Sequence, residues 1–209
     1  MSEDGAGTSR GDAAQDAVVT DEDDAATDPP RRVAPWIALG VAIVLAGLFV
    51  VLVTASGDDN ATADSPLLGR AAPEAVGEFE DGSTFDLARR KGSWVVLNFF
   101  TADCVPCIQE HPDLVAFSEQ QAQLGTDGAE LYSVVVNDSR DDVEEFFAER
   151  GGEWPVIYSE LGEMSVAFGV SAVPETWIID PAGVVRVRMI SKVTAEQLNV
   201  TLQQLREGA

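Results

Sequence analysis

Regions of different hydrophobic pattern follow one another along the 209-residue chain. Residues 1–32 hold small and acidic side chains, which predicts a disordered acidic tail because so few apolar groups cannot offset the entropy of ordering. Residues 33–55 are dominated by one apolar run, and residues 56–66 are small and polar, as flexible linkers are. Residues 67–206 have the size of one globular domain.

The apolar run is long enough to cross a membrane. From Val33 to Val53, 21 consecutive residues carry no charged or polar side chain, and a helix of them reaches roughly 30 Å. Arg31 and Arg32 precede the run, which favours a cytoplasmic N-terminus. We expect an uncleaved single-pass anchor in the cell membrane, with the domain on the extracytoplasmic side. A cleavable signal peptide, whose apolar region is normally about 7 to 15 residues, and a twin-arginine export signal are the alternatives.

Short apolar stretches in the domain alternate between strand and helix patterns. An unbroken apolar run such as WVVLNFF is typical of a strand buried on both faces, whereas helices show apolar residues three or four positions apart. The pattern predicts an α/β fold in which helices flank a central mixed sheet. We expect a hairpin over 79–85, strands over 94–100, 131–136, 155–158, 176–180 and 184–190, and helices over 105–124, 139–151, 161–168 and from 194 onward.

The formal net charge of −23 limits the partners of this chain. A surface so acidic repels nucleic acid, so we expect no nucleic-acid function.

Cys104 and Cys107 are the only cysteines, and they stand three positions apart at the predicted strand-to-helix junction. No second pair exists to complete a four-ligand zinc site, so we expect no metal there. A structural disulfide is the alternative, but a bridge closing so short a loop constrains the unfolded chain little. The helix dipole stabilises a thiolate at the first turn, which predicts Cys104 as the nucleophile and Cys107 as the resolving thiol. Val105 and Pro106, inside the ring, are expected to tune the reduction potential.

Three longer motifs, FFTADCVPCIQEHP, FGVSAVPETWIID and DPAGVVR, resemble the membrane-anchored TlpA/ResA/CcmG group of cytochrome c maturation. The resemblance covers roughly residues 67 to 206. It implies a thioredoxin-like fold with an N-terminal β-hairpin and a central βα insertion. It also implies a thiol:disulfide oxidoreductase, without a further cofactor, that acts on protein cysteine pairs such as those of apocytochrome c. A membrane protein that donates electrons would re-reduce it.

The resemblance also assigns roles to residues outside the cysteine pair. Glu110 matches the glutamate of the group's active site and would assist proton transfer at Cys107, although exposed helix glutamates are common. Val173, Pro174 and Glu175 match a substrate-binding loop with a cis proline, although a proline can equally start a strand. His111 is expected only to be a neighbour of the site.

Two positions depart from the pattern of the group. Asp103 stands where a tryptophan usually precedes the first cysteine, and its charge should oppose thiolate formation at Cys104. Asn98 stands where cytosolic thioredoxins have a buried acid, so proton handling would fall to Glu110.

Other functions stay open from the sequence alone. Thr101 to Cys104 repeat the T-x-x-C half of a peroxiredoxin site, but Leu97 stands where that site has a proline. Rapid consumption of peroxide would support a peroxidase. A general dithiol oxidant would differ from a reductant in its reduction potential. A binding module with an inert bridge would form no mixed disulfide with a partner.

Overall fold

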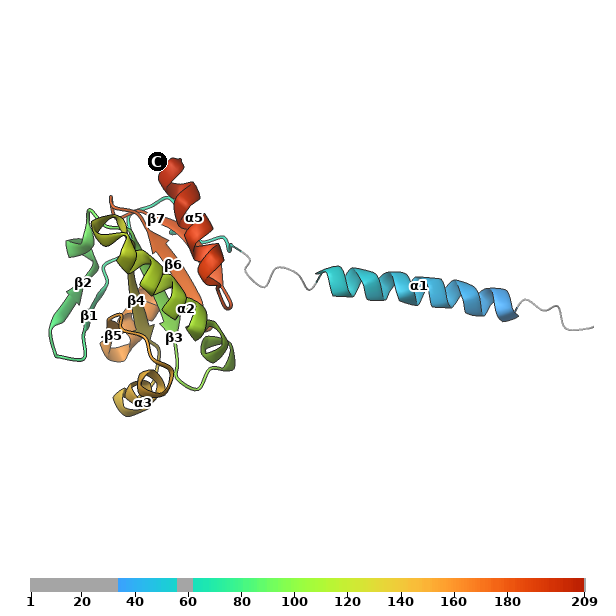
Figure 1. The fold of residues 1–209 in the computed structure, drawn as a ribbon, viewed down its shortest axis with the longest axis horizontal. Helices are drawn as coiled ribbons and strands as arrows, with labels where there is room; N and C mark the ends of the chain where they lie inside the picture. Colours follow the sequence, from blue (N-terminus) through green and yellow to red (C-terminus); the bar gives the residue numbers. More distant parts are fainter. Residues whose placement is uncertain (1–33, 56–61, 209) are drawn as a thin grey trace, which may run out of the picture. The chain divides into compact units, whose positions relative to one another are not determined.

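The computed structural model describes residues 34–55 and 62–208 (Figure 1). The predicted acidic tail and most of the predicted linker lie outside the described residues. The first helix, α1 (Ala34–Ala55), covers the apolar run, and its described side chains, those of residues 36–50, are exposed. Over the described ranges, no helix was found that is long and apolar enough to cross a membrane. The chain divides between Val50 and Val51 into two compact units, and the second contains the globular domain.

A seven-stranded mixed sheet forms the centre of the domain, in the order β2-β1-β5-β4-β3-β6-β7. The β3–β4 and β4–β5 pairs are parallel, while the β1–β2, β1–β5, β3–β6 and β6–β7 pairs are antiparallel. The predicted mixed sheet is therefore confirmed. The strands are β1 (Val76–Glu78), β2 (Thr84–Asp86), β3 (Val95–Phe100), β4 (Glu130–Val135), β5 (Val156–Tyr158), β6 (Glu175–Ile179) and β7 (Val185–Ile190).

Helices cover both faces of this sheet. Figure 1 shows α2 and α5 side by side on one face, and the Ala195 N–H at the start of α5 donates to the Asp113 carboxylate of α2. Met164 and Phe168 of α4 pack into the core cluster of the opposite face. The helices are α2 (Val105–Gln123), α3 (Arg140–Arg150), α4 (Glu163–Phe168) and α5 (Ala195–Glu207), with 3-10 turns η1 (Leu87–Arg90), η2 (Gly125–Asp127) and η3 (Glu160–Gly162).

Local sequence signals explain where several of these elements begin and end. The Ser139 side chain accepts a hydrogen bond from the Asp142 N–H at the start of α3, and Thr194 forms a capping box with Gln197 at the start of α5. The predicted continuous helix over 161–168 is wrong in its first turn. Leu161 and Gly162 both have positive φ values, 53° and 68°, so α4 begins only after this break.

The elements around β3 place the candidate site. All six residues of β3 are buried, because β4 and β6 pair with it on either side and helices cover its faces. Side chains alternate along a strand, so Leu97 and Phe99 enter one core cluster while Val96 and Phe100 face the α2 side. Asn98 shares that side. The hairpin β1–β2 and the α3–β5 insertion agree with the architecture expected from the resemblance.

Candidate active site

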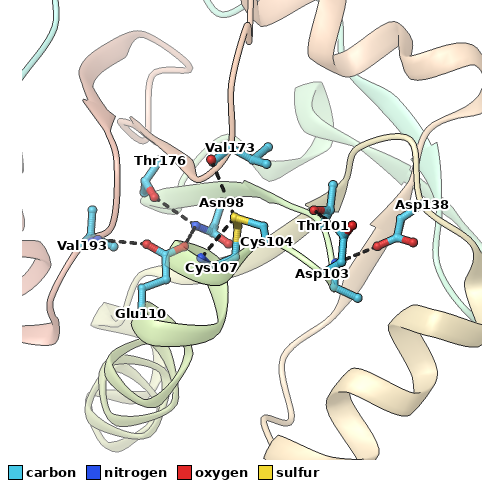
Figure 2. The surroundings of a disulfide bond; sticks show 11 residues. Asn98, Thr101, Asp103, Cys104, Cys107, Glu110, Asp138, Val173, Thr176 and Val193 are labelled. Carbon is cyan, nitrogen blue, oxygen red and sulfur yellow. Dashed lines mark hydrogen bonds between the residues drawn. A yellow bond between two sulfur atoms is a disulfide. The ribbon is translucent and has the colours of Figure 1, made fainter. Parts of the chain in front are cut away.

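The two cysteines lie where β3 passes into α2. Cys104 is the residue before the first turn of α2, and it forms a disulfide with Cys107 across a Cα–Cα distance of 5.2 Å (Figure 2). The Cys107 N–H donates a hydrogen bond to Cys104 Sγ at 3.2 Å. Pro106 fits in the first turn because its missing N–H would have no partner within the helix. This position gives a Cys104 thiolate both a backbone donor and the positive end of the helix dipole.

The two sulfur atoms differ in accessibility. Cys107 is 2 % exposed, whereas Cys104 is only half-buried. A substrate can therefore reach Cys104, while Cys107 is accessible only from within the protein. This asymmetry agrees with the predicted division into a nucleophilic and a resolving thiol. Val105, between them, is 62 % exposed and contributes an apolar surface beside Cys104.

Glu110 is a buried carboxylic acid one turn along α2 from Cys107. It is 1 % exposed, so the alternative of a solvated helix carboxylate is wrong. Asn98 Nδ2 donates to Glu110 Oε1 at 2.8 Å, and the Val193 N–H donates to Oε2 at 2.9 Å (Figure 2). Burial raises the pKa of Glu110 to about 7, although both hydrogen bonds oppose the shift. Residues with a pKa near neutral exchange protons readily at physiological pH.

Asn98 and Val193 are partners that the sequence did not identify. Asn98 stood out only as a departure from cytosolic thioredoxins, and Val193 carried no signal. Asn98 also donates to Thr176 Oγ1 of β6 at 3.1 Å. The Glu110 carboxylate is thus held by groups from two other segments of the chain.

The loop before β6 lies against the disulfide. The Val173–Pro174 peptide bond is cis, as the resemblance implies, and Pro174 is buried. Val173 O lies 3.7 Å from Cys104 Sγ (Figure 2). Val173 is only partly buried, so its backbone lies beside the sulfur at which substrate exchange is expected.

Glu175 differs from its predicted role in substrate binding. Its side chain is 1 % exposed, and both carboxylate oxygens accept hydrogen bonds from Arg188, at 3.0 and 2.9 Å. Trp177 Nε1 also donates to Oε1 at 2.7 Å. The carboxylate is therefore occupied inside the domain, and a substrate cannot contact it in this structure. Its visible effect is to fix the start of β6, next to Pro174.

Two carboxylates lie on the other side of Cys104. Asp103 is exposed and accepts a hydrogen bond from Thr101 Oγ1 at 2.8 Å (Figure 2). Asp138, which the sequence did not single out, accepts from the Ala102 N–H at 2.6 Å. Their negative charges oppose a Cys104 thiolate. The Thr101 hydroxyl is thus directed to the Asp103 carboxylate.

His111 links α2 to the insertion. The ring is 3 % exposed, and Nε2 lies 2.8 Å from Gly151 O. Its centroid lies 4.7 Å from that of Phe146 and 5.2 Å from that of Trp154. Burial lowers the pKa of His111, so the ring is neutral at pH 7. The residue therefore holds the insertion against the helix that carries the disulfide.

The fold and the site together define a thioredoxin-like protein whose disulfide lies at the start of a helix, as redox-active disulfides do. Comparison with known proteins gives the same classification. Residues 68–188 match the model of the AhpC/TSA family. Thiol:disulfide interchange protein HelX of Rhodobacter capsulatus is 30 % identical over 156 residues, 72 % of this chain and 83 % of HelX. Thiol-disulfide oxidoreductase ResA of Bacillus subtilis is 30 % identical over 157 residues, 73 % of this chain and 86 % of ResA.

A solved structure gives the same result. A thiol:disulfide interchange protein of the thioredoxin family from Chlorobium tepidum superposes with a TM-score of 0.58 at 25 % identity, over 68 % of this chain and 98 % of that one. The chain belongs to the AhpC/TSA family and is a thiol:disulfide oxidoreductase of the type that includes DsbE, HelX and ResA.

Proposed function

We propose that this oxidoreductase reduces disulfides in exported proteins outside the cytoplasm, with the haem-attachment cysteine pair of apocytochrome c as a substrate during cytochrome c maturation. The observation that carries the proposal is the arrangement around the disulfide. An accessible Cys104 lies before a buried Cys107, and Glu110, a carboxyl group whose pKa is about 7, lies one helical turn further along α2. The choice of substrate follows the resemblance to the TlpA/ResA/CcmG group.

The reaction starts from the reduced dithiol. The Cys104 thiolate attacks one sulfur of the substrate disulfide, a mixed disulfide forms, and the other substrate sulfur leaves as a thiolate that takes up a proton. Cys107 then loses its proton to Glu110 and attacks Cys104, which releases the second substrate sulfur. Two electrons pass to the substrate, and the protein is left with the Cys104–Cys107 disulfide.

We further propose that residues 33–55 anchor the protein in the membrane, with the domain on the extracytoplasmic side. The 21-residue apolar run and the arginines before it support this arrangement. A reductant outside the cytoplasm must itself be re-reduced, so a membrane protein that carries electrons across the bilayer is the expected donor. Anchoring would raise the effective concentration of the domain near that donor.

Trapping of the partner tests the proposal. In Cys107→Ala protein the resolving thiol is absent, so mixed disulfides between Cys104 and its substrates should accumulate in the native membrane. Non-reducing electrophoresis and mass spectrometry would identify the attached proteins, with Cys104→Ala/Cys107→Ala as the matched control. Recovery of apocytochrome c, attached through its cysteine pair, would support the proposed substrate. Reproducible recovery of other exported proteins without apocytochrome c would contradict it and identify the substrates instead.

The direction of electron flow needs a separate measurement. A reductant requires a reduction potential at or below that of the glutathione pool, about −220 to −260 mV by extraction methods. Equilibration of the full chain with glutathione buffers of known ratio gives this value. A potential near that of strong oxidants, about −120 mV, would assign the protein to the general dithiol oxidants.

A further inference from the structure

The turn between β7 and α5 contains a residue in an uncommon backbone conformation. Ser191 follows β7 directly and has a φ of 74°, in the left-handed region. A residue with a Cβ is disfavoured there, and glycine is the usual occupant. Residues held in such a conformation cluster at functional sites, where the surrounding structure maintains them. We call residues 191–193 the 191–193 turn.

The 191–193 turn is bonded to two parts of the active site. The Ser191 N–H donates to Pro174 O at 3.0 Å, which attaches the turn to the cis-proline. Two residues later, the Val193 N–H donates to Glu110 Oε2 at 2.9 Å (Figure 2). A single short turn thus connects the cis-proline loop with the buried carboxyl group on α2.

Both ends of the 191–193 turn are fixed, so its backbone has little freedom. Before it, Ile190 is the last residue of β7 and pairs with the first residue of β6. After it, the Ala195 N–H donates to the Asp113 carboxylate of α2 at 3.1 Å. The chain must change direction between these two anchor points, and a left-handed residue provides that change. The direction of the Val193 N–H therefore depends on the backbone of Ser191.

The Val193 N–H favours one protonation state of Glu110. A backbone N–H can only donate, and its donation stabilises a carboxylate more than a neutral acid. Burial raises the pKa of Glu110, and among the contacts that lower this pKa the Val193 N–H comes first, ahead of Asn98. Glu110 and Val193 are both 1 % exposed, so bulk water has little access to replace a displaced donor. Displacement of the N–H should therefore raise the pKa of Glu110 further.

We propose that Ser191 is a positioning residue for the proton transfer from Cys107. Its left-handed backbone directs the Val193 N–H to the Glu110 carboxylate, while its own N–H holds the turn against the cis-proline loop. This inference rests on the proposed function, in which a carboxylate oxygen of Glu110 takes the proton of the Cys107 thiol. The resulting thiolate bonds to Cys104 as the substrate sulfur leaves, so an N–H that keeps Glu110 ionised before the transfer accelerates this step.

Substitutions at position 191 separate the backbone of Ser191 from its hydroxyl. Ser191→Gly removes the hydroxyl but suits the left-handed conformation, so the turn should keep its path. Ser191→Val places a β-branched side chain in a conformation that such residues adopt only as outliers, so the turn should rearrange and displace the Val193 N–H. Ser191→Ala is a milder change in the same direction, and it provides the test if Ser191→Val does not fold.

Gly82→Val is the matched control for backbone strain. Gly82 has a φ of 79° and is exposed in the β1–β2 hairpin, where an added Cβ would meet nothing within 4 Å. This hairpin forms the edge of the sheet opposite to β7. The substitution therefore puts the same residue into the same backbone conformation of the same domain, away from the active site.

The probe is a disulfide between two copies of a short peptide that contains one cysteine. The reduced full chain, solubilised in detergent, is mixed rapidly with this disulfide at pH values from about 5 to about 9, and the reaction is quenched with acid and analysed by mass spectrometry. The mixed disulfide at Cys104 forms as one peptide leaves, and it disappears as Cys107 releases the second peptide. Its time course gives the rate constants of both steps.

The second step should depend on pH through Glu110. With the unsubstituted protein, its rate constant should rise with pH and level off above the pKa of Glu110, about 7. In Ser191→Val the midpoint should move to about pH 8, since a hydrogen bond to a charged group is worth roughly one pKa unit or more. At pH 7 the second step should then slow about fivefold, in proportion to the ionised fraction. The first step, which does not use Glu110, should keep its rate.

The controls decide between positioning and general strain. Ser191→Gly and Gly82→Val should keep the midpoint of the unsubstituted protein. An unshifted midpoint in Ser191→Val and Ser191→Ala would overturn the positioning role, and so would an equal shift in either control. Equal slowing of both steps without a shifted midpoint would also overturn it, because loosening of the domain has that effect.

Failure of the proposed function would look different. If the unsubstituted protein forms no mixed disulfide with the peptide probe, disulfide exchange at Cys104 is contradicted. If Glu110→Gln leaves the second step unchanged, the proposed proton acceptor is wrong. The outcomes that overturn only the role of Ser191 leave both of these results as the proposed function predicts them.

Discussion

Asn98 Nδ2 donates a hydrogen bond to Glu110 Oε1 at 2.8 Å, and this contact joins the central strand of the sheet to the helix that carries the disulfide. Both residues are 1 % exposed. Asn98 can donate to the carboxyl group in either protonation state, so Glu110 keeps its position when it gains or loses a proton. The pair therefore provides a fixed proton acceptor inside the domain.

Replacement of Glu110 by Gln should change how stability depends on pH. The carboxyl pKa is raised from 4.5 to about 7 by burial, so between these values the folded protein binds more protons than the unfolded chain. The free energy of unfolding should therefore fall as pH rises through this window, by about 3 kcal/mol at 1.36 kcal/mol per pKa unit. Glu110→Gln should lack this decrease.

Urea unfolding of the oxidised protein at about pH 5 and about pH 8 measures the effect. The relevant quantity is the difference between the unsubstituted protein and the variant, because His111, whose pKa is lowered, changes stability in the opposite direction below its unfolded value of 6.5. Glu119→Gln removes an exposed carboxylate from the same helix and serves as the control. Equal pH dependence in all three proteins would show that Glu110 does not titrate in this range.

The same substitution should slow the second step of disulfide exchange. Without a proton acceptor near Cys107, its attack on the mixed disulfide should slow by about 10²-fold or more at pH 7, the usual contribution of a general base. The mixed disulfide should then accumulate transiently, and rapid acid quenching with mass spectrometry would detect it. Accumulation of the mixed disulfide shows that only the second step has slowed, as loss of a proton acceptor predicts. Partial unfolding of the variant would instead slow the first and the second step together.

Removal of the charge at Asp103 should make Cys104 more acidic. The exposed carboxylate lies one residue before the cysteine and disfavours its thiolate. In reduced Asp103→Asn protein, the rate of Cys104 alkylation by iodoacetamide near pH 6 should rise about two- to fivefold, a range set by screening in water. Asp127→Asn, at an exposed position in η2, is the control. If the increase in the Cys104 alkylation rate is equally large in high salt, its cause is not electrostatic.

The buried ion pair between Arg188 and Glu175 should be costly to break. Arg188→Met leaves the Glu175 carboxylate without its charged partner at 1 % exposure, which should reduce the free energy of unfolding by about 3 to 5 kcal/mol. Adding Glu175→Gln removes the buried charge and should recover at least half of this loss. Urea unfolding of the two single variants and the double variant completes the cycle. If the double variant is no more stable than Arg188→Met, the loss does not come from an unpaired charge.

The sequence predicted well those features that depend on neighbouring residues. The unbroken apolar run of β3, the caps at Ser139 and Thr194, and the placement of Cys104 and Cys107 at a helix start all follow from local patterns. The error at Leu161 is also local, because two successive residues with positive φ interrupt a stretch whose apolar spacing is helical. The spacing of apolar residues does not indicate such a break.

Tertiary structure decided the environment of the polar groups. Nothing near Glu110 in the chain shows that the Val193 N–H, 83 positions away, accompanies Asn98 as a partner of its carboxylate. The internal role of Glu175 likewise depends on Arg188 on the neighbouring strand. The pKa of a side chain depends on its burial and its hydrogen bonds. Both come from atoms that folding brings together from distant segments of the chain.

By itself, the sequence determined the chemistry available to this protein: two cysteines at redox spacing, an α/β domain, and an apolar run before it. The folded domain decided how that chemistry is arranged. It left Cys104 accessible and buried Cys107, moved the pKa of Glu110 to about 7, and turned Glu175 inward. The physical reason is that residue types and local spacing fix which groups react and where helices begin, whereas solvent exposure and electrostatics depend on packing between segments far apart in the chain.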